Sequence, residues 1–256
     1  MNTIRTILCP IELQSVSDKA ANYAATLARL YGGRLYFLHV IAPPPTATYE
    51  YLISTSDITE GIDDASYNEM KMLADTLEAE GIDVGIDMWI GDVSETIKQY
   101  ISFVQPDLLV MGTHGRLGIT RWFMGSVTES IMRNSLVPVL TVSPRTKGEL
   151  AFRRILVTTD FSSGTTDALD YACCIAHENG SEITVLHVVD DTNTALSIRY
   201  GSTFLETAWT KLESLIPADV RKRCRVSTKV EAGTPYRAIV RTLESMKADL
   251  LIMNRY

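Results

Sequence analysis

Short apolar segments recur along the chain, and nearly all of their residues are hydrophobic rather than alternately hydrophobic and polar. Clear cases are Ile7–Ile11, Leu35–Ile41 and Leu108–Met111. A continuous apolar run bounded by turn residues is typical of a parallel strand that is covered on both faces. We therefore expect these segments to be strands of a buried parallel sheet.

Between these segments, hydrophobic residues return every three or four positions, which is the period of an α-helix. One such stretch runs from Ala20 to Tyr31 and ends at Gly32, and another runs from Met70 to Leu77 and ends before Gly81. A third follows Gly91. Because parallel strands need right-handed crossover connections, this alternation predicts a twisted sheet with helices on both faces.

The second half of the chain repeats the first. RTILCPI at residues 5–11 returns as RRILVTT 148 residues later, and LYFLHV at residues 35–40 returns as ITVLHV with the same offset. The DLLVM segment beginning at Asp107 returns as DLLIM at Asp249, an offset of 142. Because order and spacing both recur, the sequence predicts two copies of one fold. His39 and His187 are equivalent in this repeat, which favours a structural role for both.

We expect the first domain to span residues 1–143, the linker residues 144–151 and the second domain residues 152–256. Domain one would close with a helix after Gly125 and an edge strand at Val137–Val142. The second copy stops just past its fourth strand, at Asn254, and has no counterpart of residues 113–142. Either the protein ends there naturally or a tail follows. The fold class is thus α/β, with two doubly wound parallel-sheet sandwiches, the second lacking its last helix and strand.

The amino-acid composition limits the classes of partner that the protein is expected to bind. The 24 basic and 31 acidic residues give a formal charge of −7, and the densest basic run, Arg221–Arg225, is short. Nucleic acid is therefore not an expected partner. A signal-peptide pattern and a membrane-length apolar stretch are both absent from the sequence, so we expect a cytoplasmic protein and no membrane partner.

The four cysteines, Cys9, Cys173, Cys174 and Cys224, show no metal-binding spacing. We interpret them as small buried hydrophobic residues in a reducing compartment, and we expect no metal site.

The segment after Leu108–Met111 carries the candidate chemistry. Gly112, Gly115, Gly125 and Ser126 follow the spacing G-x2-G-x9-G-S. Glycines let backbone amides approach a phosphate closely, and the following helix would present its positive end to an anion. Arg116 lies in this loop, where it would pair with phosphate oxygens or face solvent. Alternatively, Ser126 with Glu129 forms an ordinary capping box that needs no ligand.

The position of the loop favours a ligand, because it leaves the carboxyl end of a predicted parallel strand. Neither G-x-x-x-x-G-K-[ST] nor G-x-G-x-x-G occurs, which argues against a Walker-type NTPase and a nicotinamide dehydrogenase. The run at residues 111–142, MGTHGRLGITRWFMGSVTESIMRNSLVPVLTV, resembles the signature region of the universal stress protein family in its ATP-binding branch. The first strand segment and the LHV motif are also similar to that family.

The resemblance implies strand order 3-2-1-4-5 in domain one, with ATP across the carboxyl ends of strands one and four. Glycine and serine residues of the loop would hold phosphates and ribose, and the backbone of Val40 would meet the adenine. Mg²⁺ is left open as an accompanying ion. The expected nucleotide contacts are Pro10, Ile11, Glu12, Val40, Met111, Gly112, His114, Gly115, Arg116, Gly125, Ser126, Val127 and Thr128.

One residue departs from the family pattern. Glu12 stands where the ATP-binding branch usually has aspartate, and we expect binding to be retained with altered affinity. Domain two has the aspartate, Asp160, but Asn254 replaces Gly112 there, so we expect it not to bind ATP in this way.

The edge strand Val137–Val142 is expected to pair two chains into a homodimer. The leading hypothesis is a nucleotide-responsive stress-response protein. A slow ATP hydrolase, with Glu12 or Asp92 as a base, and a nucleotide-free interaction scaffold remain as alternatives, and no catalytic residue is singled out.

Overall fold

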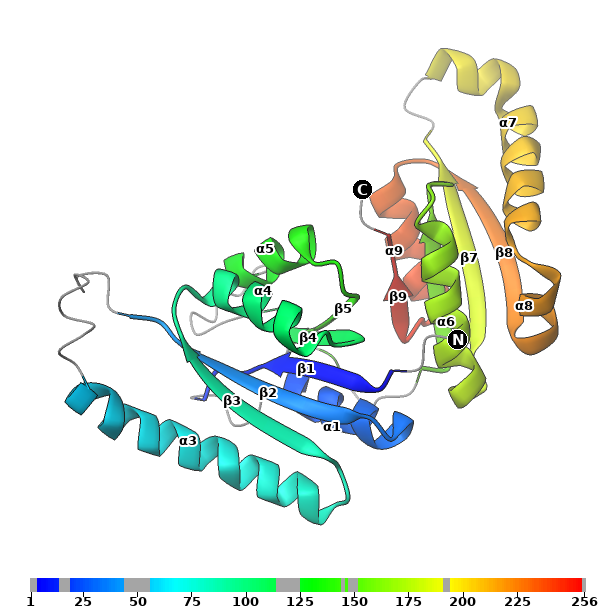
Figure 1. Ribbon diagram of the computed structural model, residues 1–256. Coiled ribbons are helices and arrows are strands. Elements are labelled where there is room, and N and C mark those ends of the chain that lie inside the picture. Colours follow the sequence, from blue (N-terminus) through cyan, green and yellow to red (C-terminus); the bar gives the residue numbers. More distant parts are fainter. Residues whose placement is uncertain are drawn as a thin grey trace. The chain divides into compact units, whose positions relative to one another are not determined.

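The computed structural model describes residues 4–13, 19–43, 56–113, 125–143, 146, 152–190 and 194–254 (Figure 1). The chain divides into two compact units, Thr3–Gly148 and Glu149–Tyr256. The boundaries at residues 143 and 152 stay a prediction, because most residues between them lie outside the described ranges.

The first unit is a five-stranded parallel sheet in the order β3-β2-β1-β4-β5, which confirms the predicted strand order. Strand β5 begins two residues later than expected. The elements are β1 (Thr6–Pro10), α1 (Lys19–Tyr31), β2 (Arg34–Ile41), α3 (Ser56–Ala79), β3 (Val84–Ile90), α4 (Val93–Val104), β4 (Leu108–Gly112), α5 (Ser126–Asn134) and β5 (Val139–Val142).

The strand order reverses between β1 and β4, and this reversal distributes the helices over the sheet. Right-handed crossovers to β2 and β3 place α1 and α3 on one face, and the return to β4 and β5 places α4 and α5 on the other (Figure 1). Under α4 and α5 lies a buried core cluster of Leu8, Leu38, Ile97, Tyr100, Leu109, Met111 and Ile131. The apolar runs of the sequence are therefore strands buried on both faces.

The second unit is a four-stranded parallel sheet in the order β8-β7-β6-β9, which confirms a second copy with one strand fewer. Its elements are β6 (Arg154–Thr159), α6 (Thr165–Asn179), β7 (Glu182–Val189), α7 (Thr194–Leu215), α8 (Ala218–Arg223), β8 (Arg225–Ala232), α9 (Pro235–Met246) and β9 (Leu250–Ile252). Strand registers repeat as well: Leu35 pairs with Val84, and Ile183 pairs with Val226. Residues 148 and 142 positions apart are thus structurally equivalent.

Each repeat carries the same aspartate contact at the amino end of its central strand. Asp107 Oδ2 accepts hydrogen bonds from the backbone N–H groups of Arg5 and Thr6, both at 2.9 Å. Asp249 Oδ2 accepts from Arg153 at 3.0 Å and from Arg154 at 2.8 Å. A carboxylate that accepts two backbone N–H groups makes charge-assisted hydrogen bonds, which are stronger than neutral ones. The aspartate of the repeated DLL segment therefore ties strand four to strand one.

We expect Asp107→Ala to lower the free energy of unfolding of the first domain by about 1–2 kcal/mol, because two charge-assisted hydrogen bonds are replaced by exposed bonds to water. Urea unfolding at neutral pH measures the change. Asp83→Ala is the matched control, since the Asp83 side chain makes an exposed ion pair with Arg34 at 3.4 Å and should cost little. Equal stability of the two variants would contradict the interpretation.

The two repeats differ in the side chains that connect β3 to α4 in domain one and β8 to α9 in domain two. In domain one, the Tyr100 hydroxyl donates to Asp87, and its ring meets Trp89 edge-on with centroids 5.3 Å apart. Phe103 lies 6.1 Å from Trp89 and 6.0 Å from Tyr100, again between centroids. Burial first, and then the hydrogen bond to Asp87, raise the pKa of the Tyr100 phenol well above its ordinary value. The phenol therefore remains a neutral donor.

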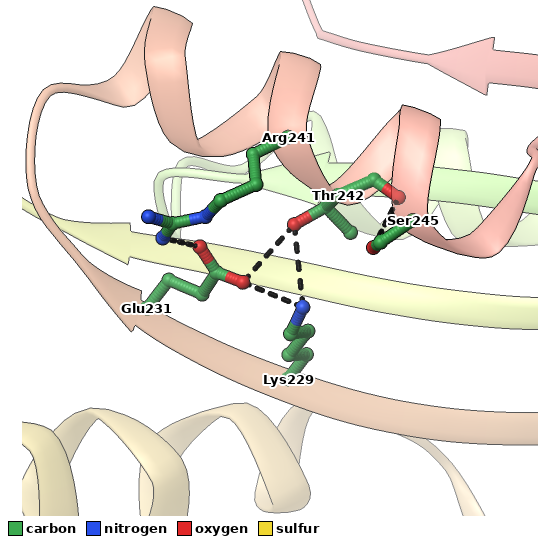
Figure 2. A network of polar contacts seen from close by, with 5 residues as sticks. All are labelled: Lys229, Glu231, Arg241, Thr242 and Ser245. Carbon is green, nitrogen blue, oxygen red and sulfur yellow. Dashed lines mark hydrogen bonds and ion pairs between the residues drawn. The ribbon is translucent and has the colours of Figure 1, made fainter.

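The equivalent positions of domain two form an ionic network (Figure 2). Glu231 contacts Arg241 and lies 2.5 Å from Lys229 Nζ, and it accepts from the Thr242 hydroxyl at 3.2 Å. Ser245, where domain one has Phe103, donates to the Thr242 carbonyl at 3.0 Å. The same packing of a helix against a strand is thus made by aromatic rings in one repeat and by charged side chains in the other.

Candidate nucleotide-binding edge of domain one

The carboxyl ends of β1 and β2 bring several predicted residues together. Pro10 ends β1, and the buried Ile11 follows it and donates its N–H to the Leu38 carbonyl at 2.9 Å. His39 Nδ1 lies 3.0 Å from the Ile11 carbonyl oxygen. Because a carbonyl only accepts, Nδ1 carries the hydrogen in this contact. The β1 chain is therefore fastened to β2 just where it leaves the sheet.

The repeat supports a structural role for both histidines. His187 Nδ1 lies 2.8 Å from the Thr159 carbonyl oxygen, the same contact that His39 makes in domain one. A contact kept in both copies, one of which has Asn254 where the other has Gly112, fits the fastening of strand ends rather than catalysis.

Glu12 and Val40 lie at this edge. Glu12 is exposed, directly after Ile11, and Val40 is half-buried on β2 beside Trp89 of β3. The extra methylene of glutamate relative to aspartate places its carboxylate farther from the backbone at the end of β1.

The turn from β4 to α5 is closed at its base. Met111 is buried, and Gly112 ends β4. The Gly125 N–H donates to the Thr113 carbonyl at 2.9 Å, so the two ends of segment 114–124 are held together. His114, Gly115 and Arg116 lie within that segment, outside the described residues.

Helix α5 begins differently from an ordinary capping box. Its N-cap is Gly125, which has no side chain to cap the helix, and Ser126 is already the first helical residue. The carboxylate of Glu129 contacts Arg133 Nη2 at 2.8 Å. The alternative of a Ser126–Glu129 capping box is therefore wrong, because serine is one position too late and the glutamate is paired along the helix.

The first turn of α5 presents donors. An α-helical N–H bonds to the carbonyl four residues earlier, so the helix itself offers no carbonyl acceptor to the N–H groups of Ser126, Val127 and Thr128. The first intrahelical bond runs from Glu129 N–H to the Gly125 carbonyl at 2.9 Å. Thr128 is buried, and its hydroxyl donates to the Gly112 carbonyl at 2.9 Å, which fixes the helix against the end of β4. A rigid set of amides with the positive end of a helix dipole is suited to an anion.

In domain two, the equivalent edge is lined by residues whose contacts the sequence did not predict. Phe161 has a left-handed backbone, with φ at 67°, and its ring lies 4.1 Å from the His187 ring. Lys211 Nζ lies 4.3 Å from the Phe161 ring centroid. The Asp160 carboxylate accepts from the Ser162 N–H at 2.9 Å, and hydrogen bonds from Ser162 hold its pKa below the usual value. The aspartate is thus engaged by its own turn.

The described residues contain no group of three or more side chains suited to a metal ion. Across the same part of the chain, no helix is long and apolar enough to cross a membrane. All four cysteines are free thiols, three of them buried.

These features define a tandem of doubly wound α/β domains, the first with helix amides at the reversal point of its sheet. A family model described as the universal stress protein family matches residues 3–143 and, a second time, residues 151–255. The chain therefore belongs to the universal stress protein family, with two copies in tandem, and the resemblance seen in the sequence is confirmed.

Individual relatives agree. A universal stress protein of Methanocaldococcus jannaschii is 28% identical over 141 residues, which cover 55% of this chain and 83% of that protein. One of Mycolicibacterium smegmatis is 26% identical over 188 residues, 71% of this chain and 63% of that protein. The solved structure of a universal stress protein from Archaeoglobus fulgidus covers 97% of this chain and 86% of its own, at 24% identity and a TM-score of 0.69. The last likeness shows the fold.

Proposed function

We propose that domain one binds ATP or another adenine nucleotide, and that its occupancy regulates a stress response in the cytoplasm. The observation that carries the proposal is the first turn of α5. Its amides at Ser126, Val127 and Thr128 lie past the carboxyl end of β4, beside the point where the strand order reverses. Open α/β sheets bind ligands at such a point, and phosphates bind at such helix ends.

In this proposal each region has a role. Gly112, Gly125 and Ser126 hold phosphates and ribose, with His114, Gly115 and Arg116 completing the loop. The backbone of Val40 meets the adenine, and Pro10, Ile11 and Glu12 line the other side of the crevice. Buried Met111 and Thr128 keep β4 and α5 in register with this site.

We also propose that two chains associate through β5 (Val139–Val142), the edge strand of the first sheet. Three of its four residues are only half-buried. An exposed apolar edge favours pairing with another strand.

Ser126→Asp tests the nucleotide site. Ser126 is exposed at the first position of α5, so a carboxylate there favours the helix through its dipole while repelling a triphosphate. We expect wild-type protein to bind ATP in isothermal titration, and the variant to bind at least about tenfold more weakly, a difference of about 1.4 kcal/mol. The titration is run with and without Mg²⁺.

Ser102→Asp is the matched control, because it adds the same charge at an exposed position near the far end of α4. Its affinity should equal that of the wild type. Absence of ATP binding by the wild type, or equal affinities of the wild type and Ser126→Asp, would refute the proposal.

A further inference from the structure

The second domain has an open cavity of about 170 Å³ near the amino ends of β7 and β8. Asp160 lies at the other end of the strands, after the carboxyl end of β6. Helix α6 and the turn after it line one side, and the end of α8 with the start of β8 lines the other. Its lining residues are Ala176, His177, Gly180, Ser181, Arg223, Cys224 and Arg225. Cys224 therefore has a route to small molecules in solvent although its exposed fraction is only 9%.

A second thiol lies behind Cys224. Cys224 is the C-cap residue that follows α8. Its N–H donates to the Val220 carbonyl at 2.8 Å, and its Sγ lies 3.7 Å from the carbonyl oxygen of Cys173. Cys173 is on α6 and is 6% exposed. The Cys173 thiol is also within hydrogen-bonding reach of the Cys224 side chain, so two thiols 51 residues apart in the chain lie close together at one helix junction.

The first repeat shows that packing alone does not require thiols here. The positions equivalent to Cys173 and Cys224 are Ala25 and Ile82, which are buried with exposed fractions of 5% and 4%. The same junction between a first helix and the segment before the third strand is therefore built from purely aliphatic side chains in domain one.

We propose that Cys224 is a site of oxidation by hydroperoxides and that Cys173 resolves it, forming a Cys173–Cys224 disulfide within the second domain. The Cys224 sulfur attacks hydrogen peroxide, so that an S–O bond forms, the O–O bond breaks, and the thiol proton leaves with hydroxide as water. The Cys173 sulfur then attacks the sulfenic acid, so that the S–S bond forms and a second water leaves. Two thiols and one peroxide give one disulfide and two waters.

The electrostatics set this order. Burial first, and then the charge and hydrogen bonding of Cys224, raise the pKa of the Cys173 thiol to about 12, while Arg223 acts in the opposite direction. Cys173 is therefore a poor first nucleophile. Once peroxide has converted Cys224 to the sulfenic acid, the Cys224 sulfur is an electrophile beside Cys173. The resolving attack by Cys173 therefore follows the oxidation of Cys224.

Peptide mapping after oxidation tests the proposal. Native full-length protein is treated with hydrogen peroxide, its remaining thiols are alkylated, and unreduced peptides are analysed by mass spectrometry. We expect a Cys173–Cys224 linked peptide, loss of two of the four free thiols, and their recovery with a reductant. Cys9, buried in β1, should remain alkylatable after unfolding.

Cys173→Ala provides the matched variant, because alanine occupies the equivalent position of domain one. Without its resolving partner, Cys224 should proceed to the sulfinic acid, which a thiol reductant does not reverse. The proposal is overturned if the wild type keeps both thiols under these conditions, if Cys224 links to Cys174 instead, or if Cys224 reaches the sulfinic acid equally fast in both proteins.

Discussion

Replacing Gly33 by valine is expected to lower the free energy of unfolding of the first domain by about 3 kcal/mol. Gly33 lies between α1 and β2, and a Cβ atom there would lie 2.9 Å from the carbonyl oxygen of Arg5 and 3.0 Å from that of Ile4. Both obstacles are backbone atoms of the chain entering β1, and the Arg5 carbonyl also accepts from the Arg34 N–H at 2.7 Å. Relief of the clash would therefore cost pairing between the two strands that carry Pro10 and Val40.

The repeat supplies the control for this variant. Domain two has Ser181 at the equivalent position, where its hydroxyl donates to the Phe152 carbonyl, the counterpart of the Ile4 carbonyl. Gly33→Ser should thus be less damaging than Gly33→Val, since its hydroxyl can turn a close approach into a hydrogen bond. Urea unfolding monitored by circular dichroism measures both. A valine variant as stable as the wild type would show that the start of β1 shifts freely.

The second large effect concerns the ionic network of domain two. We expect Glu231→Gln to lower the stability of that domain by about 2–3 kcal/mol at pH 7, because the change leaves Lys229 and Arg241 beside an uncharged group. The Glu231 side chain is only 11% exposed. Glu244→Gln on the same helix is the control, since Glu244 is exposed, and it should change stability by less than about 0.5 kcal/mol.

The effect should depend on pH in a defined direction. Burial alone would raise the pKa of Glu231, but hydrogen bonds from Lys229, Arg241 and Thr242, together with the charge of Lys229, bring it down to about 2. A carboxyl with a lowered folded-state pKa stabilises the protein above its unfolded pKa and loses that contribution as the pH falls. The stability difference between wild type and Glu231→Gln should therefore be full above about pH 5 and shrink toward pH 2. Urea titrations at several pH values measure it, and a difference independent of pH would contradict this assignment.

Much of the fold could be predicted because it follows from hydrophobic pattern and repetition. The offsets of 148 and 142 residues reappear as identical strand registers, with Leu35 opposite Val84 and Ile183 opposite Val226. Contacts made by side chains across the sheet could not be predicted in the same way. Asp107 is one of 31 acidic residues, and only the three-dimensional structure shows that it binds the N–H groups of Arg5 and Thr6.

The candidate site likewise has features that the sequence predicted and features that it did not. Glycine spacing correctly indicated where β4 ends and α5 begins, but the Ser126–Glu129 pattern suggested a cap that does not form. A capping box depends on a one-residue difference in where the helix starts, and Gly125 takes the cap position instead. Cys224 was interpreted as an ordinary buried residue, because nothing in the spacing of Cys173 and Cys224 shows that they meet.

The aromatic contact between β3 and α4 and the ionic contact between β8 and α9 restrict which strands and helices the two domains could exchange. A hybrid that carried strand β8 opposite helix α4 would place Glu231 near the positions of Tyr100 and Phe103, without Arg241 and Thr242. Its carboxylate would then lose most of its donors in a half-enclosed place. A stable hybrid would therefore have to exchange strand and helix together, and recombination between the two halves of this gene would be tolerated only where a crossover keeps each set whole.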